Sequence, residues 1–174
     1  QGEACTAASR ALVHREVYDE VVQRVGAAVA KFVVGNGANP GTHVGPLATQ
    51  AQQQRALDYL RIGQEEGAQI AAQADLPTDP ELANGFFVPP TLLVDVSPRM
   101  RVAQEEIFGP VVAVIPFDDE AEAVRIANGT PFGLVAAVYT RDHARGVRVG
   151  RQLDAGTVLV NHYLRAGIGI PFGG

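Results

Sequence analysis

The region from Pro110 to Asn161 alternates short apolar runs with amphipathic segments, and this alternation constrains the fold more than any other feature of the chain. It predicts strands over Val111–Phe117, Leu134–Thr140 and Gly156–Asn161, separated by helices over Asp119–Asn128 and Asp142–Leu153. Because the joints are short, right-handed crossovers and a largely parallel sheet follow. The near-continuous apolar strands are typical of a sheet that helices cover on both faces.

The first hundred residues have a looser pattern. They predict an extended stretch at Ala11–His14, helices over Glu16–Phe32 and from Thr49 to Gly67, a Gly- and Pro-rich loop over Gly35–Pro46, and a strand over Gln69–Ala74. The Pro89-Pro90 pair interrupts the apolar run Phe86–Val96, which favours an edge or bent strand there. The expected class is therefore α/β, a mainly parallel sheet with helices on both faces.

Composition excludes several kinds of partner. The 174 residues are 47% hydrophobic and carry a net charge of -5 without a basic run, so we expect no nucleic-acid partner. No apolar stretch is long enough for a bilayer, and no signal-peptide pattern opens the chain. One cysteine fits a reducing compartment, and we expect a cytoplasmic protein. The four histidines are dispersed, so no metal centre is expected.

The single cysteine, Cys5, stands among small residues in GEACTAAS. At the start of a short helical turn, unpaired N–H groups would favour its thiolate, which is the nucleophilic form. A buried, inert residue is the commoner fate of a lone cysteine. The local sequence leaves both interpretations open.

A second candidate site is the run Glu105-Glu106-Ile107-Phe108-Gly109-Pro110. Two adjacent carboxylates cannot point the same way, so we expect one in solvent and the other beside the Phe108 ring. A carboxylate suits the hydroxyls of a ribose, and a ring suits a flat heterocycle. An ordinary acidic helix end is the alternative.

The exit of the last strand carries Asn161-His162-Tyr163, at the end of a parallel strand where such sheets place ligand sites. His162 is a candidate general base at this position, although a hydrogen-bonding surface residue is the commoner role for a histidine at a strand exit. The chain contains no GxGxxG sequence after a strand, no GxSxG elbow and no P-loop.

Several segments together resemble the aldehyde dehydrogenase superfamily. GEACTAAS is similar to its cysteine active-site motif, QEEIFGPV to its Glu-x-Phe-Gly-Pro motif, and NGTPFGLVAAVYTRD, AGTVLVN and PFGG to further blocks in the family's order. HVGPLATQAQQQRALDYLRIGQEEGA resembles the intervening helix. The similarity covers essentially the whole chain, and it favours Cys5 as a nucleophile.

The resemblance implies a chemistry and a set of site residues. The Cys5 thiolate attacks an aldehyde, hydride passes to NAD or NADP, and a thioester is hydrolysed to the acid. Glu106 would hold the nicotinamide-side ribose, Phe108 would lie against the nicotinamide end, and Phe172 in the closing PFGG would line the substrate pocket. The backbone N–H of Cys5 would be an oxyanion donor, and Gln52 is a weaker match near a cofactor ribose.

The resemblance also implies that 1–174 is a partial, nucleophile-bearing catalytic domain, incomplete at both ends. The cofactor-binding domain, the general base and a C-terminal oligomerisation strand would lie outside it, so the fragment alone is expected to be inactive. The longer protein from which it comes is expected to be a homodimer or homotetramer. The alternatives are a CoA-acylating aldehyde dehydrogenase and a non-catalytic structural or binding relative. The loop after Asn161 departs from the family's aromatic box, and Arg165 there is a candidate for favouring an anionic aldehyde, although a solvated arginine is commoner.

Overall fold

The computed structural model describes residues 1–163, 169 and 171–174, so Arg165 and its expected role lie outside the described residues. The described elements, in chain order, are β1 (Arg10–His14), η1 (Arg15–Val17), α1 (Tyr18–Val29), α2 (Gln50–Glu65), β2 (Gln69–Gln73), η2 (Pro80–Leu82), β3 (Thr91–Val94), α3 (Arg101–Gln104), β4 (Val111–Phe117), α4 (Glu120–Ala127), β5 (Val135–Val138), α5 (His143–Gly150) and β6 (Thr157–Val160). The chain forms two compact units, Gln1–Pro116 and Phe117–Gly174.

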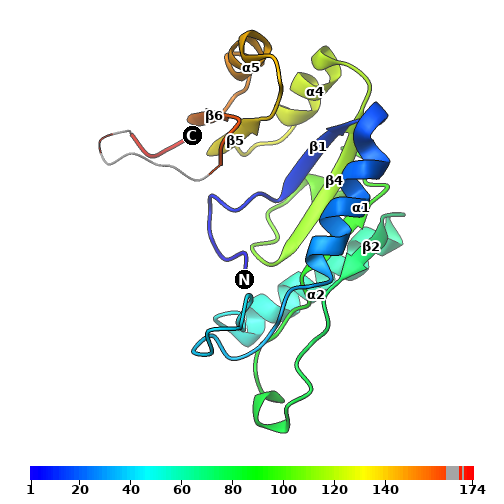
Figure 1. The fold of residues 1–174 in the computed structure, drawn as a ribbon, viewed down its shortest axis with the longest axis vertical. Coiled ribbons are helices and arrows are strands. Elements are labelled where there is room, and N and C mark those ends of the chain that lie inside the picture. The colour runs from blue at the N-terminus through cyan, green and yellow to red at the C-terminus, as the bar shows by residue number, and fades with distance from the viewer. Residues whose placement is uncertain (164–168, 170) are drawn as a thin grey trace. The chain divides into compact units, whose positions relative to one another are not determined.

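The first unit is built on a sheet with the strand order β1-β4-β3-β2 (Figure 1). Strand β3 pairs in parallel with β4, and β2 pairs antiparallel with β3 through a register shift between Ile70 and Ala72. The second unit holds the parallel pair β5–β6. The expected α/β class with mainly parallel pairing is confirmed, although the described strands divide between two sheets.

Strand β3 is an interior strand, which corrects the expectation of an edge strand over Phe86–Val96. It lies between β4 and β2, and both Leu92 and Leu93 are 0% exposed. The two prolines immediately precede the strand, which begins at Thr91. Every residue of β3 therefore keeps its N–H for the ladder, and the prolines do not exclude a central position.

Helices cover both faces of this sheet. Leu92 packs with Val13, Val114 and the apolar side of α1, whereas a Cβ placed on Gly63 of α2 would lie 3.4 Å from Leu93. Because successive strand residues point to opposite faces, α1 and α2 lie on opposite faces of the sheet. The first unit thus has its core on both sides of β3 and β4.

Only part of the apolar stripe of α1 packs against the core. Val21, Val22 and Val29 pack against the core, while Val25 is 37% exposed and no residue of the helix is fully buried. The helix pattern is confirmed, but the stripe is wider than the surface that the described part of the chain covers.

The second unit has well-capped helices and half-buried strands. The carboxylates of Asp119 and Asp142 accept hydrogen bonds at the N-termini of α4 and α5. Asn161, at φ 54°, binds the backbone of Thr140 through both its amide nitrogen and its amide oxygen. In the described part of the chain, no helix combines the length and the apolar character needed to cross a membrane.

Candidate active site

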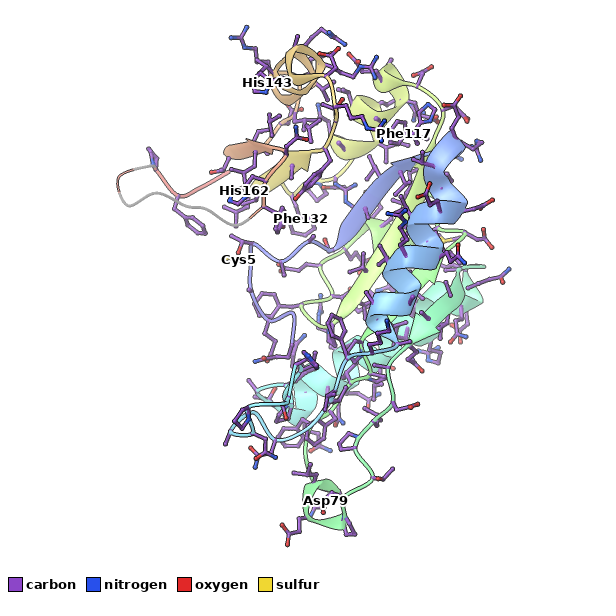
Figure 2. All side chains as sticks on the ribbon, viewed as in Figure 1. Cys5, Asp79, Phe117, Phe132, His143 and His162 are labelled. Carbon is purple, nitrogen blue, oxygen red and sulfur yellow. The ribbon has the colours of Figure 1, made fainter. Side chains whose placement is uncertain are left out.

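Cys5 lies in a tight turn near the N-terminus and is exposed (Figure 2). The Ala7 N–H donates to the Ala4 carbonyl at 2.8 Å, which closes one turn around the cysteine. Residues 4–7 form this turn and do not continue into a helix. The cysteine is thus not buried in the described structure, while its role as a nucleophile stays a prediction.

The residues before Cys5 are fixed from two directions. The Glu3 carboxylate accepts from the Ala48 N–H, at 3.1 and 3.2 Å for its two oxygens. Gly2 has φ +80°, and a Cβ there would come within 2.4 Å of the Gly109 carbonyl oxygen. The backbone at Gly2, in the same motif as Cys5, therefore lies directly against the Gly109-Pro110 turn, so the fold brings together two motifs that are far apart in the sequence.

Glu105 is the half-buried member of the carboxylate pair, and it is held by two side chains. The Arg101 guanidinium donates to its two oxygens at 2.8 and 3.0 Å, and the Tyr59 hydroxyl donates at 2.5 Å. Hydrogen bonds from Arg101 and then from Tyr59 lower the pKa of the Glu105 carboxyl to about 2. Glu105 thus has a structural role in this chain.

Glu106 is the solvated member of the pair. Within the described residues, no hydrogen bond or ion pair joins its carboxylate to another side chain. The two carboxylates do point differently, as expected, and both follow the end of the short helix α3. Glu106, which the family resemblance assigns to a cofactor ribose, therefore has carboxylate oxygens that a ligand can reach.

Phe108 is half-buried and has a strained backbone, with φ 58°. A left-handed conformation is uncommon for a bulky side chain and persists only where the surroundings impose it. Here the Gln52 amide donates to the Ile107 carbonyl at 2.9 Å and to the Phe108 carbonyl at 2.7 Å. Gln52 thus binds the protein backbone beside the candidate cofactor residues.

Sequence reasoning missed two members of this arrangement, Arg55 and Tyr59. Arg55 donates to the Glu106 carbonyl at 2.5 Å, and Tyr59, only 5% exposed, binds Glu105. Together with Gln52 they occupy positions i, i+3 and i+7 of α2, which lie on one face of a helix. That polar spacing was a usable signal, but nothing local indicated the segment that this face would meet.

Phe172 and His162 belong to the second unit. The Phe172 side chain is 65% exposed, and its expected place in a substrate pocket stays a prediction. His162 is exposed as well, which agrees with a surface role (Figure 2). Among the described residues, no group of three or more His, Cys, Asp or Glu side chains is placed to hold a metal ion.

The first unit therefore combines an exposed thiol, an exposed carboxylate and an aromatic side chain whose backbone carbonyl is hydrogen-bonded to Gln52. The thiol can act as a nucleophile toward an electrophilic carbon. A carboxylate accepts hydrogen bonds through both oxygens, which suits a pair of neighbouring hydroxyl groups.

Comparison with known proteins gives one consistent result. The profile of the aldehyde dehydrogenase family matches residues 1–174. An aldehyde dehydrogenase of Didymella fabae is 54% identical over 174 residues, which is 100% of this chain and 35% of the relative. A solved structure, described as a putative aldehyde dehydrogenase from Burkholderia cenocepacia, superposes with a TM-score of 0.94 at 45% identity, covering 99% of this chain and 36% of that one.

A second solved structure is a point mutant of betaine aldehyde dehydrogenase from Staphylococcus aureus, in complex with NAD+ and with a BME-modified cysteine. It is 35% identical with a TM-score of 0.94, and the match covers 99% of this chain and 35% of that protein. The chain thus spans about a third of the length of the relatives that it matches. With a family profile matched from end to end, the chain belongs to the aldehyde dehydrogenase family.

Proposed function

We propose that these residues are the nucleophile-bearing part of a longer NAD- or NADP-dependent aldehyde dehydrogenase, which oxidises an aldehyde to a carboxylic acid. The relatives that the chain matches are about three times its length, and they are named as aldehyde dehydrogenases. The observation that carries the proposal is the packing of Gly2, in the motif that holds the exposed Cys5, against the Gly109 carbonyl, in the motif that holds the exposed Glu106. The longer protein is called the complete enzyme below.

Cys5 supplies the covalent step in this proposal. Its thiolate attacks the aldehyde carbon, and the carbonyl oxygen becomes the alkoxide of a thiohemiacetal, which the Cys5 N–H would stabilise. NAD or NADP supplies the acceptor for the hydride that then leaves the same carbon. Water adds to the resulting Cys5 thioester, and cleavage of the C–S bond releases the acid and restores the thiolate.

Glu106 and Phe108 are the proposed cofactor residues, and the structure passes a simple test of fit. The Glu106 carboxylate is exposed, so it can accept hydrogen bonds from the two hydroxyls of a ribose without breaking an ion pair. The Phe108 ring stands on a backbone that Gln52 holds in place, as a wall for a flat ring requires. Phe172 is the proposed substrate-pocket residue.

The test of the nucleophile is Cys5→Ala and Cys5→Ser in the complete enzyme. The complete enzyme is made from its own gene or as a chimera in which these 174 residues replace the matching segment of the Didymella fabae relative. We expect kcat/KM for aldehyde oxidation to fall by about a thousandfold or more in both variants, because the covalent step is lost. NAD+ affinity and the melting temperature should stay near those of the unsubstituted protein. Full activity in Cys5→Ser would overturn the proposal.

The proposal also includes water as the acceptor of the acyl group and a dimeric or tetrameric complete enzyme. Release of free acid without added CoA supports the hydrolytic reaction, whereas strict CoA dependence identifies the acylating alternative. Light scattering of the complete enzyme tests the proposed dimer or tetramer.

A further inference from the structure

The segment from Glu105 to Phe108 is attached to helix α2 through its backbone. Arg55 donates to the Glu106 carbonyl, and the Gln52 amide donates to the carbonyls of Ile107 and Phe108. Three successive carbonyls of this segment are therefore held by two side chains of one helix. Because these bonds fix the backbone, they also fix the directions in which the Glu106 and Phe108 side chains leave it.

Tyr59 lies at the centre of this attachment. Its hydroxyl donates to Glu105, and the guanidinium carbons of Arg55 and Arg101 lie 5.0 and 5.6 Å from its ring centroid. Arg55 also donates to the Tyr59 hydroxyl at 3.4 Å. Tyr59 is only 5% exposed, so it is closed off from any ligand. It nevertheless contacts Arg55, which binds the Glu106 carbonyl, and the carboxylate of Glu105, the residue before Glu106.

This cluster separates the two neighbouring glutamates. Arg101 and Tyr59 together satisfy both oxygens of Glu105, so Glu105 is fixed on the α2 side of the segment. With Glu105 fixed there and the backbone held by Arg55 and Gln52, Glu106 is left as the exposed carboxylate. Groups that are held in their binding geometry beforehand lose less entropy when a ligand arrives.

We propose that Tyr59 is a positioning residue for the cofactor: through Glu105 and Arg55 it holds the Glu105–Phe108 segment in the geometry that presents Glu106 and Phe108 to the nicotinamide-side ribose. This inference rests on the proposed function of the site. Tyr59 acts without touching the cofactor, and its contribution is to the affinity of the site and the rigidity of the segment.

The test is Tyr59→Phe in the complete enzyme, a substitution that keeps the ring and removes only the hydroxyl. We expect the Kd for NAD+, measured calorimetrically, to rise by roughly threefold to tenfold, as the loss of one hydrogen bond to a carboxylate implies. Amide hydrogen exchange in a peptide covering 104–111 should become faster. The KM for NAD+ should rise more than kcat falls.

Tyr18→Phe is the matched control. Its hydroxyl is in the same unit but accepts from the Asp95 N–H at 3.4 Å and does not contact the Glu105–Phe108 segment. The control should leave the Kd and the exchange of 104–111 unchanged. If Tyr59→Phe gives the Kd of the unsubstituted enzyme, with or without faster exchange, the positioning role is overturned.

A double-mutant cycle protects the test against a general loss of structure. Tyr59→Phe and Glu105→Gln act through the same carboxylate, so their combined effect on the Kd should be clearly smaller than the product of the single effects. Independent effects would contradict the inference.

The Glu106→Gln variant separates this inference from the proposed function. An unchanged Kd for NAD+ in Glu106→Gln would remove Glu106 from the cofactor site. A higher Kd in Glu106→Gln, together with no effect of Tyr59→Phe, would overturn the positioning role alone.

Discussion

At the scale of single residues, Glu105 and Glu106 are neighbours of identical chemistry with different surroundings. Glu105 forms an ion pair with Arg101, and the two side chains are 41% and 49% exposed. Glu105 also accepts a hydrogen bond from the hydroxyl of the buried Tyr59. Glu106 is exposed. An exposed ion pair by itself contributes little to stability, so the effect of Glu105 depends on its additional bond to a buried hydroxyl.

The lowered pKa of Glu105 predicts a pH-dependent contribution to stability. Its pKa falls from the ordinary 4.5 to about 2 on folding, so the folded state favours the charged carboxylate. The contribution is therefore fully present above the unfolded pKa and is lost as pH falls from there through the folded value. We expect Glu105→Gln to lower the urea midpoint of the complete enzyme at neutral pH, and the difference to shrink as the pH falls toward 2.

Glu65→Gln is the control for this measurement. Glu65 forms an i,i+4 ion pair with Arg61 at 2.7 Å on an exposed part of α2, so its substitution removes the same charge without touching Tyr59. A gap between Glu105→Gln and the unsubstituted protein that stays constant down to low pH would contradict the prediction.

At the scale of elements, the Cys5 turn depends on the close approach of two backbones. Gly2 has φ +80° and lies against the Gly109 carbonyl, so a side chain at position 2 meets both a conformational cost and a backbone obstacle. The conformational term alone is about 1–2 kcal/mol. Since the obstacle is a main-chain carbonyl, the chain cannot relieve the contact by rotating a side chain.

Gly2→Ala therefore displaces the turn that carries the nucleophile. We expect slower alkylation of Cys5 by iodoacetamide, or loss of its protection by aldehyde, together with a marked fall in kcat/KM of the complete enzyme. Gly37→Ala is the matched control, because a Cβ at Gly37 meets nothing within 4 Å and its φ lies outside the left-handed region. Equal behaviour of the two variants would show that the close approach has no role.

At the scale of the whole molecule, the chain consists of two compact units with different degrees of burial. The first contains the fully buried residues Leu92, Leu93 and Ile115, whereas every residue of β5 and β6 in the second is only half-buried. Phe132 and Phe172 of the second unit are 56% and 65% exposed.

The chain by itself is expected to lack dehydrogenase activity. Purified residues 1–174, mixed with an aldehyde and NAD+, should produce no NADH above a Cys5→Ala control, because the relatives that share this segment are about three times longer. Joining the same residues to the remaining parts in the chimera should restore turnover. Turnover by the chain alone, abolished by Cys5→Ala, would refute the prediction.

Local patterns were sufficient for much of this fold. The helices α2, α4 and α5 begin where Thr49, Asp119 and Asp142 cap them, and these caps are readable because each acts on N–H groups two or three residues away. The types of group at the candidate site, a thiol, a carboxylate and an aromatic ring, were equally visible in the sequence.

The sequence by itself determined the element types, the family and the motifs, since these depend on neighbours along the chain. Only the tertiary structure decided the interior position of β3, the choice between Glu105 and Glu106, and the attachment of the second motif to α2. Tyr59 and Glu105 are 46 residues apart, and Gln52 and Phe108 are 56 apart. Contacts over such separations depend on how helices pack on the sheet, and no local pattern records that packing.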